Sequence, residues 1–305
     1  MILSICVPTY NRPDYLIEVI KSCFSVTEVP CEILIGDDSQ LDNAKVVNEI
    51  EYPANFVVHY FHHKTPLKQN KNVDFLLQRV KGKYCVLMHD DDGFNNSGLL
   101  NLLEKAKELP PNIVVFGKQI LIDENGKIDL ASSNAANKDY CRSEEYAGLQ
   151  EDSTITAINQ SCPSNGFIFP GYLAKRIGYR SSEIVGNACD FDFVLRLALE
   201  EECGFYFINE FVSFYRMGHS AVSTNTNSAL YFWKIIQEYR LDETYPDIIS
   251  QKYLNQLNKW IGTAYRFRDL PLYKYLFYHK NYPFLRRFSL RGILDFFRFL
   301  NLIIK

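Results

Sequence analysis

The most constraining feature of the sequence is an apolar run, residues 84–88, that leads through His89 into three consecutive carboxylates, Asp90–Asp92. The run has the β-branched and apolar character of a buried strand. Neighbouring carboxylates repel one another, and like charges raise carboxyl pKa values. A hard divalent cation, Mg²⁺ or Mn²⁺, would balance such a cluster and would also accept phosphate oxygens from a substrate. A solvated acidic turn is the alternative, but the place just beyond a strand, where open α/β sheets bind ligands, favours the cation.

Strand and helix patterns alternate through the first two-thirds of the chain. Strands are predicted at 2–7, 32–36, 56–61, 84–88 and 113–122, with helices between them at 13–23, 43–51, 72–80 and 99–109. A short strand and helix at 166–178, a helix at 188–198 and a last strand at 205–215 follow, and helical, aromatic sequence begins at 230. Residues 123–165 are polar and irregular, which is typical of a substrate loop. The alternation predicts an α/β fold with a parallel, doubly wound sheet and right-handed crossovers.

The composition is that of a globular protein with a large core. Of the 305 residues, 47% are hydrophobic, which suffices for one large domain or for a domain of about 220 residues with an appendage. The net charge of −3 gives no general support for a nucleic-acid partner. The eight cysteines are scattered without a C-x-x-C pair. We interpret them as small buried hydrophobes in a reducing cytosol, and not as a disulfide framework or a zinc site.

The chain begins at Met1 directly with a strand pattern, without the basic region and cleavage site of a signal peptide. It contains no window of about 18 uncharged apolar residues, so we expect no membrane-spanning helix. We therefore expect a cytoplasmic protein that is soluble or lies on a membrane surface.

Polar residues follow three of the predicted strands, at 8–12, at Asp37–Asp38 and at Asp90–Asp92. Because the carboxyl ends of parallel strands meet at one edge of a sheet, these three loops can hold a single ligand. The sequence has neither G-x-G-x-x-G nor G-x-x-x-x-G-K-[ST]. A nucleotide diphosphate would therefore have to be held by a metal and not by a nest of backbone amides.

Five segments occur in a characteristic order: Ser4–Arg12, Ile33–Ser39, Gly82–Tyr84 followed by Asp90–Asp92, Cys189–Leu197, and Tyr215–His219. Together they resemble the inverting glycosyltransferases of family 2, of the bacterial surface-polysaccharide type, over roughly residues 2–223. The resemblance implies the GT-A fold, a Rossmann-like and mostly parallel sheet flanked by helices, with a helical C-terminal extension. We expect a catalytic domain at 1–225, with a nucleotide-binding half at 1–122 and an acceptor-binding half at 123–225. The extension would occupy residues 226–305.

The resemblance also implies roles for residues that bind the donor. Asp38 would read the uracil-like base of a nucleotide sugar, and Asp37 would support that strand end or contact the ribose. Lys68 and Asn72 would contact the base or a phosphate. The expected nucleotide-binding residues are Pro8, Thr9, Tyr10, Arg12, Asp37, Asp38, Lys68, Asn72, Asp90 and Asp91.

The metal ligands and the catalytic base are implied in the same way. Asp92 matches the direct ligand of a Mn²⁺ or Mg²⁺ ion, and His219 matches a position that approaches the metal or the diphosphate, although a structural role suits it equally. Asp190 stands where the family places its catalytic base. Two residues depart from the family pattern. Cys189 replaces the usual glutamate before the base, and Gly218 lengthens the spacing before the histidine.

Some of these residues also have ordinary structural explanations. Asp190 lies in the first turn of a predicted helix, where the helix dipole favours an acid. Asp192 and Arg196 are four residues apart, which favours a helical ion pair over a substrate role. We interpret His89 as an ordinary loop residue, although it adjoins the acid triplet. Cys189 is not expected to be a nucleophile because no histidine base is evident beside it.

Residues 272–305 differ in charge from the rest of the chain. They carry seven basic residues against Asp295 alone, a net +6 that leaves −9 elsewhere, and ten aromatic residues lie among them. A basic, aromatic, amphipathic helix is typical of a membrane-surface anchor. Packing against the catalytic domain or a second subunit is the alternative, and single-stranded nucleic acid does not suit the acidic remainder. At about 100° per residue, one stripe would hold Arg287, Arg291, Arg298 and Lys305, and an adjoining face Phe288, Gly292, Phe296, Phe299 and Ile303.

These observations and the resemblance predict an enzyme, a hexosyl- or N-acetylhexosaminyltransferase. It would transfer a sugar with inversion from a UDP-linked nucleotide sugar to a hydroxyl of a glycan or lipid-linked acceptor, in capsule, O-antigen or exopolysaccharide synthesis. We expect it at the cytoplasmic face of the inner membrane, with peripheral membrane contact through 272–305, and a homo-oligomer is compatible with the sequence.

Two alternatives are a sugar nucleotidyltransferase and a non-catalytic nucleotide-sugar-binding protein. The first would be supported by a glycine- and basic-rich phosphate loop near the N-terminus, which residues 8–13 lack. The second would be expected to lose Asp92 or Asp190, and both are present.

Overall fold

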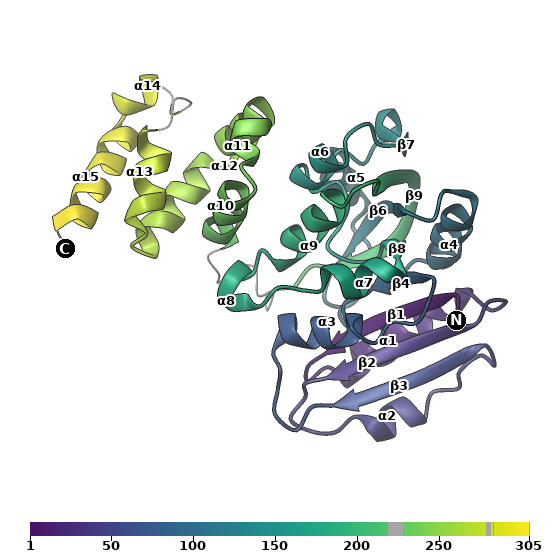
Figure 1. Ribbon diagram of the computed structural model, residues 1–305. Coiled ribbons are helices and arrows are strands. Elements are labelled where there is room, and N and C mark those ends of the chain that lie inside the picture. The colour runs from purple at the N-terminus through teal and green to yellow at the C-terminus, as the bar shows by residue number, and fades with distance from the viewer. Residues whose placement is uncertain (219–227, 279–281, 283, 305) are drawn as a thin grey trace. The chain divides into compact units, whose positions relative to one another are not determined.

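The computed structural model describes residues 1–218, 228–278, 282 and 284–304 (Figure 1). The chain divides into two compact units. One comprises residues 1–181 and 189–221, and the other residues 182–188 and 222–305. The first unit is an α/β domain and the second is helical.

The first unit is built on a nine-stranded, mostly parallel sheet with the order β3-β2-β1-β4-β8-β6-β9-β5, to which β7 is added beside β9. Strands β1 to β4 run parallel, as do β6 and β9, whereas β8 runs antiparallel to both β4 and β6. The predicted fold class is therefore confirmed, with one reversed strand in the middle of the sheet. The strands are β1 (Leu3–Thr9), β2 (Cys31–Asp37), β3 (Phe56–His62), β4 (Tyr84–Leu87), β5 (Gly93–Phe94), β6 (Ile113–Ile122), β7 (Gly148–Leu149), β8 (Ile168–Pro170) and β9 (Gly204–Arg216).

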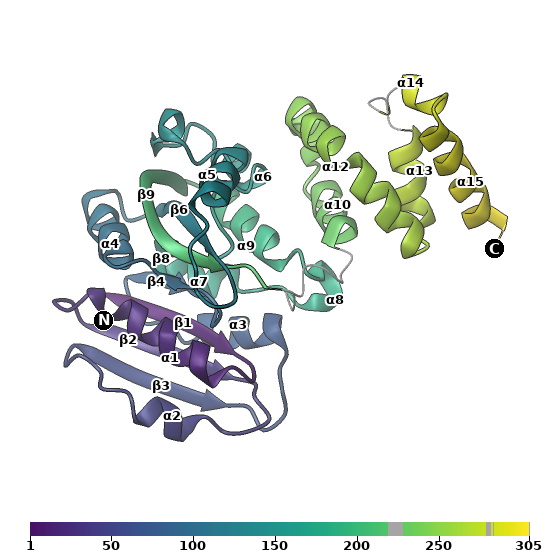
Figure 2. The ribbon, with the colours of Figure 1, turned by 180° about the vertical axis from the view of Figure 1, so that it is seen from behind.

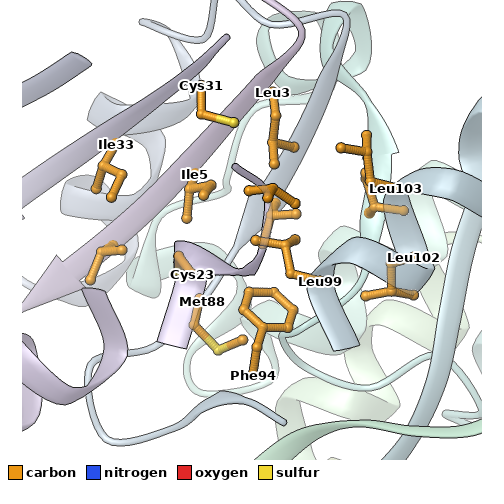
Figure 3. Close-up of a cluster of buried hydrophobic side chains, with 14 of the residues drawn as sticks. Leu3, Ile5, Cys23, Cys31, Ile33, Met88, Phe94, Leu99, Leu102 and Leu103 are labelled. Carbon is orange, nitrogen blue, oxygen red and sulfur yellow. The ribbon is translucent and has the colours of Figure 1, made fainter. Parts of the chain in front are cut away.

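Helices cover both faces of this sheet (Figure 2). Because side chains alternate along a strand, Leu3 and Ile5 point to one face, where they join a core with Leu16 of α1 and Leu99 of α4 (Figure 3). On the opposite face, Leu76 of α3 lies close to Gly36 of β2. The helices of this unit are α1 (Pro13–Ser22), α2 (Ala44–Asn48), α3 (Gln69–Leu77), α4 (Gly98–Glu108), α5 (Leu130–Asp139), α6 (Ser153–Ile158), α7 (Gly171–Ile177) and α9 (Cys189–Ala198), with short 3-10 turns at Cys23–Ser25 and Glu144–Tyr146.

The prediction that residues 123–165 are irregular is wrong. They contain α5, α6, one 3-10 turn and strand β7. Both helices begin at aspartate caps: the Asp129 side chain accepts from the Ser132 amide, and the Asp152 side chain from the Ile155 amide. Such caps satisfy backbone donors at a helix start. The helices escaped prediction because α5 is polar and α6 has only six residues, so neither shows a long apolar period.

Glycine allows the entry into β8 to pass close to the end of β4. The Gly166 amide donates to the Leu87 carbonyl at 3.0 Å. Gly166 has a φ of +73°, and a Cβ there would lie 2.9 Å from the Ser213 side chain. A residue with a side chain would therefore be both strained and crowded at this point. The close approach places Asn165, the preceding residue, beside the acid triplet.

The second unit consists of α8 (Ser182–Val185), α10 (Ser228–Glu238), α11 (Leu241–Thr244), α12 (Pro246–Arg266), α13 (Leu270–Tyr278), α14 (Phe284–Arg287) and α15 (Leu290–Ile304). Its core includes Phe232 against Trp260, with ring centroids 5.7 Å apart, and Trp233 against Tyr275 at 3.9 Å. No helix in the described ranges is long and apolar enough to cross a membrane.

The predicted stripes on the C-terminal helix need correction. The helix is interrupted between α14 and α15, so Arg287 does not share a continuous helix with Arg291 and Arg298. Gly292 and Phe299, predicted on the face adjoining the basic stripe, are buried with Asp295, and Asp295 accepts from Arg286 at 2.8 Å. The apolar residues that are exposed on α15 are Leu290, Ile293, Leu294, Phe296, Phe297, Ile303 and Ile304. Lys305 lies outside the described residues.

A buried ion cluster holds the start of α9 in the first unit. The Asp192 side chain is fully buried, and its carboxylate accepts from Arg180 Nε at 3.0 Å and from Arg196 Nε at 2.9 Å. The predicted pair of Asp192 and Arg196 is thus confirmed, and Arg180 is its unpredicted second cation. The Arg196 guanidinium also donates to the Ile177 and Gly178 carbonyls at the end of α7.

Replacing Asp192 should destabilise the first unit strongly. Asp192→Ala leaves two guanidinium groups without their shared buried carboxylate, and removing one partner of a buried pair typically costs about 3–5 kcal/mol. We expect a loss of this size in the free energy of unfolding, measured with urea. The exposed pair Lys45–Glu49, at 3.8 Å, provides the control, because Glu49→Ala should cost less than about 1 kcal/mol. Equal effects of the two substitutions would contradict the structural role of Asp192.

Candidate functional site

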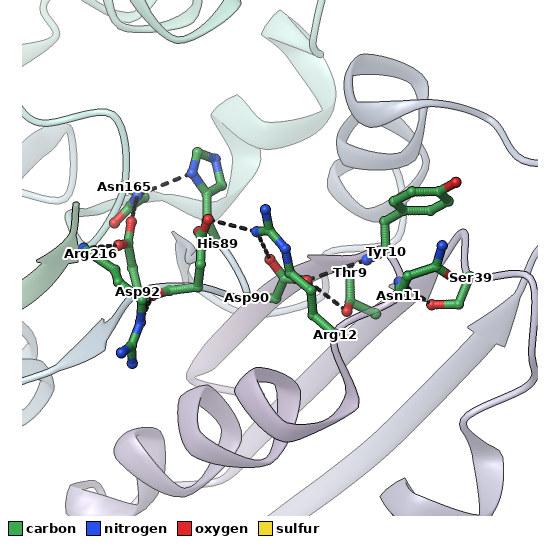
Figure 4. Close-up of polar contacts among 11 residues, drawn as sticks. Thr9, Tyr10, Asn11, Arg12, Ser39, His89, Asp90, Asp92, Asn165 and Arg216 are labelled. Carbon is green, nitrogen blue, oxygen red and sulfur yellow. Dashed lines mark hydrogen bonds and ion pairs between the residues drawn. The ribbon is translucent and has the colours of Figure 1, made fainter. Parts of the chain in front are cut away.

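The acid triplet follows β4 at the edge where the parallel strands end, and the loop after β1 holds its first member (Figure 4). Asp90 Oδ2 accepts from Thr9 Oγ1 at 2.8 Å and from the Tyr10 amide at 3.3 Å, and Oδ1 accepts from Arg12 at 3.2 Å. The same Arg12 nitrogen donates to Asp91 at 2.6 Å. Burial and the charge of Asp91 raise the pKa of Asp90, against the opposing effect of Arg12.

Asp92 is held from the other side by β8 and β9. Its Oδ2 accepts from Asn165 Nδ2 at 2.6 Å, and its Oδ1 from the Arg216 amide at 2.8 Å. Both donors are neutral. Burial, followed by the charge of Asp91, raises the pKa of Asp92 to about 7. Asp92 is therefore the acid of the triplet whose charge is least compensated by hydrogen-bonded partners.

The Arg216 side chain ties the end of β9 to this edge. Its Nε donates to the Asp91 carbonyl at 2.9 Å and its Nη2 to Glu18 at 2.8 Å. Its guanidinium lies 4.5 Å from the ring centre of Tyr15. These contacts fix the triplet's backbone while leaving its carboxylates to other partners.

His89 lies within the cluster and is not the ordinary loop residue that we predicted. Only 17% of its side chain is exposed, and Nε2 stands 4.0 Å from Asp190 Oδ1. Asn165 Nδ2 lies 3.1 Å from His89 Nδ1. Burial lowers the pKa of His89, but the charges of Asp190 and of the triplet outweigh it and raise the pKa overall.

A divalent cation fits the residues at this point. His89, Asp91 and Asp92 each offer a ligand atom, and these atoms lie within 4.8 Å of one another. Asp92 is a buried carboxylate with a raised pKa, and its hydrogen-bond donors among the described residues are neutral, so a cation would relieve an uncompensated charge. Carboxylate oxygens are the ligands that Mg²⁺ and Mn²⁺ prefer. His219, the other predicted ligand, lies outside the described residues.

Asp190, the predicted base, lies at the start of α9 and faces His89. Its Oδ1 accepts a hydrogen bond from the Tyr179 hydroxyl, and 29% of its side chain is exposed. Burial and the Asp190 charge raise the pKa of Tyr179, so that it remains a hydrogen-bond donor. Burial likewise raises the pKa of Cys189, which agrees with the expectation that this thiol is not a nucleophile.

The two acids after β2 have different surroundings. Asp37 Oδ1 accepts from the Ser39 amide at 2.8 Å, and Oδ2 accepts from Tyr60 at 2.6 Å and Asn43 at 2.9 Å. Asp37 thus supports the strand end. Asp38 Oδ1 accepts from the Leu67 amide at 3.0 Å.

The remaining predicted nucleotide-binding residues are spread along the same edge. Pro8 is buried in β1 opposite Gly36, whereas Tyr10 is 53% exposed. Lys68 is exposed just before α3. Asn72 is buried, its Nδ2 donates to the Gly36 carbonyl at 2.8 Å, and its Oδ1 lies 3.2 Å from His63. Asn72 therefore braces β2.

Sequence reasoning missed Asn165, Tyr179 and Arg216 as members of this site. Arg216 lay inside one of the recognised segments but had no assigned role. Asn165 precedes a predicted strand, and a position before a strand counts as part of the site only if that strand runs antiparallel to its neighbours. A local sequence pattern shows neither the direction of β8 nor the contact of Tyr179 with Asp190 at the start of α9.

Part of the chain is similar in sequence to known proteins. The family model described as glycosyl transferase family 2 matches residues 4–168. A Campylobacter jejuni protein named GalNAc(5)-diNAcBac-PP-undecaprenol beta-1,3-glucosyltransferase is 28% identical over 157 residues, which are 50% of this chain and 45% of that protein. Abequosyltransferase RfbV of Salmonella typhimurium is 28% identical over 196 residues, 63% of this chain and 56% of that protein. The matched region thus spans about half the length of these relatives.

A solved structure shares the whole fold. TarS 1–349 of S. aureus, in complex with UDP-GlcNAc, superposes with a TM-score of 0.60 at 15% identity, covering 99% of this chain and 90% of that one. At this identity the likeness concerns the fold alone. It extends over both units of the chain.

Binding of Mn²⁺ should depend on pH because of Asp92. Without a cation, a carboxyl whose pKa is raised contributes stability at low pH and loses it as the pH rises through about 7. A cation needs the deprotonated form, so its affinity should fall by up to about tenfold per pH unit below that value. We expect Mn²⁺ to raise Tm more near pH 8 than near pH 5. Asp92→Ala should abolish the shift, and the exposed Asp139→Ala should retain it. An equal shift at both pH values would contradict this.

Proposed function

The chain belongs to glycosyl transferase family 2, and on that premise we propose that it transfers a sugar, with inversion and with a divalent cation, from a nucleotide sugar to an acceptor hydroxyl. The observation that carries the proposal is the meeting of Asp190 with the acid triplet across His89, where His89 Nε2 lies 4.0 Å from Asp190 Oδ1. The proposed base and the proposed cation-binding carboxylates thus both lie close to His89. In a single displacement at an anomeric carbon, the base would accept the proton of the attacking hydroxyl and the cation would neutralise the leaving diphosphate.

The donor in this proposal is a UDP-linked hexose or N-acetylhexosamine. The loops after β1 and β2 are joined to each other, since the Asp38 amide donates to the Thr9 carbonyl at 3.0 Å and the Asn11 amide to Ser39 Oγ at 2.7 Å. Asp37 is used in supporting the strand end, so reading of the base falls to Asp38. The exposed ring of Tyr10 is available at the same edge for contact with the nucleotide.

The cation would be Mn²⁺ or Mg²⁺, held by Asp92 with Asp91, and by His219 as a further ligand. When bound, it would neutralise charge that develops on the departing nucleoside diphosphate. Arg12 neutralises Asp90 and part of the charge of Asp91. The protein therefore leaves the negative charge of Asp92 for the cation.

Asp190 acts as the general base. It accepts the proton of the acceptor hydroxyl as that oxygen attacks the anomeric carbon, and the electron pair of the breaking bond goes to the diphosphate oxygen. The Tyr179 hydroxyl fixes Oδ1 of Asp190, and the partial exposure of the carboxylate leaves it accessible to the acceptor. General-base assistance is typically worth about 10²–10⁴-fold in rate.

The acceptor is a lipid-linked or surface glycan in this proposal. The Campylobacter jejuni relative is named for an undecaprenol-linked substrate. A lipid-linked acceptor would hold the enzyme at the cytoplasmic face of the inner membrane, in synthesis of a capsule, an O-antigen or an exopolysaccharide. The proposed division into a nucleotide-binding half at 1–122 and an acceptor-binding half at 123–225 places the base in the acceptor half.

The second unit supports peripheral membrane contact. Leu290, Leu294, Phe297 and Ile304 are exposed by 89%, 48%, 62% and 81%, and their spacing places them along one side of α15. The opposite side, with Gly292, Asp295 and Phe299, is buried in the unit. The exposed Arg291 adjoins the apolar side of α15, and Arg287 at the end of α14 is also exposed. Exposed basic residues of this kind suit an anionic lipid surface.

Substitutions of the two central acids should separate binding from turnover. Asp92→Ala should weaken Mn²⁺-dependent binding of UDP and of the nucleotide sugar, measured by calorimetry. Asp190→Ala should bind both with wild-type affinity but should lower nucleotide release and transfer by about 10²–10⁴-fold. Wild-type turnover in Asp190→Ala would remove it as the base, and a product with the anomeric configuration of the donor would exclude inversion.

Liposome binding should depend on the outward side of α15. The double variant Leu294→Glu with Phe297→Glu should reduce binding to vesicles containing phosphatidylglycerol by at least about tenfold, because two inserted side chains are lost. Ile128→Glu with Leu130→Glu changes two exposed apolar residues of the first unit and should leave binding unchanged. Equal binding by both double variants would contradict membrane contact through α15.

A further inference from the structure

His89 carries a buried hydrogen-bonding atom without a partner. Within the described residues, His89 Nε2 is shielded from solvent and makes no hydrogen bond. The groups around it are engaged: Thr9 and Arg12 hold Asp90, Asn165 and the Arg216 amide hold Asp92, and Tyr179 holds Asp190. An unpaired buried polar atom is costly and calls for a partner. Because the side chains of His89 and Asp190 are 17% and 29% exposed, a substrate that reaches Asp190 could supply this partner.

Asn165 determines that Nε2 is a donor. Its amide nitrogen lies 2.6 Å from Asp92 Oδ2, which fixes the orientation of the amide, because only the NH₂ group can face a carboxylate. The same nitrogen lies 3.1 Å from His89 Nδ1. In the neutral ring Nδ1 therefore accepts from Asn165 and Nε2 carries the hydrogen. A protonated ring carries a hydrogen on Nε2 as well, so Nε2 donates in either state.

The His89 Nε2 donor lies close to the proposed base, Asp190. Nε2 and Asp190 Oδ1 are 4.0 Å apart, too far for a direct hydrogen bond but close enough for one oxygen atom to lie within hydrogen-bond distance of both. We propose that His89 positions the attacking hydroxyl, with Nε2–H donating to the hydroxyl oxygen while the hydroxyl proton points to Asp190. This role rests on the proposed function and adds a positioning residue to it.

Protons and electron pairs balance when the hydroxyl attacks in this arrangement. The hydrogen bond from His89 occupies one lone pair of the hydroxyl oxygen, and the other lone pair forms the bond to the anomeric carbon. The proton of the hydroxyl passes to Asp190, and His89 neither gains nor loses a proton. With Nε2 bearing a hydrogen and Nδ1 accepting from Asn165, His89 has no lone pair for a cation. Of the three residues whose ligand atoms lie together, only Asp92 and Asp91 would then hold the cation.

Two substitutions of His89 test this role. His89→Leu removes the donor, and His89→Gln retains an N–H group at a similar distance from the backbone. With the nucleotide sugar that the wild type consumes, and with alkyl glycosides or water as the attacking hydroxyl, His89→Leu should lower kcat/KM for the hydroxyl by about tenfold or more. His89→Gln should recover most of the loss. Affinities for Mn²⁺ and UDP should stay within about twofold of wild type in both variants.

Other outcomes would overturn the proposal. Unchanged kcat/KM in His89→Leu would show that the imidazole does not touch the hydroxyl, and loss of Mn²⁺ affinity with loss of activity would make His89 a metal ligand. Failure of glutamine to restore activity would indicate a purely structural side chain. Lys45→Leu, at an exposed position of α2 away from the triplet, is the control and should behave as wild type. Absence of nucleotide release by the wild type with every donor would refute the proposed function itself, and this role with it.

Discussion

Three adjacent carboxylates coexist at the end of β4 because the fold holds them from two sides. The loop after β1 supplies Thr9 and Arg12 to Asp90, and the same Arg12 reaches Asp91. The entry to β8 and the end of β9 supply Asn165 and the Arg216 amide to Asp92. Like charges this close are unfavourable without compensation. The need to satisfy the triplet therefore draws four strand ends to one place, and the candidate site is the result.

The parallel half of this arrangement was predictable from the sequence, and the antiparallel part was not. Strands β1, β2 and β4 are local apolar runs separated by helices, and parallel pairing follows from that rhythm. Strand β8 has only three residues, and no local pattern reveals its direction. Because it runs antiparallel, its amino end, and so Asn165, lies where its neighbours have their carboxyl ends. Asn165 was therefore not found by a rule that considers only polar residues after strands.

Spacing along the sequence also did not predict which side chains are buried or which charged residues from different segments form ion pairs. The pairing of Asp192 with Arg196 follows from helical spacing, but Arg180 reaches the same carboxylate from a different segment. The periodic stripes drawn through residues 287–305 assumed one helix, whereas the chain breaks between α14 and α15 and buries Asp295 with Gly292 and Phe299. Periodicity assigns residues to faces. It does not show which face the rest of the unit covers.

Some acids of the site make structural contacts while others remain available to a ligand, and no single motif shows which acid has which role. After β2, Asp37 accepts three hydrogen bonds while Asp38, within the described residues, accepts one. In the triplet, Asp90 is paired with the Arg12 guanidinium, whereas Asp92 has neutral hydrogen-bond donors. In α9, Asp192 lies between two arginines while Asp190 meets a tyrosine and remains partly exposed. In each group one carboxylate makes structural contacts, and another keeps unused hydrogen-bonding or charge capacity. Rigid support directly beside an under-compensated acid is the condition that electrostatic preorganisation requires, because the support prevents the acid from relaxing before a ligand arrives.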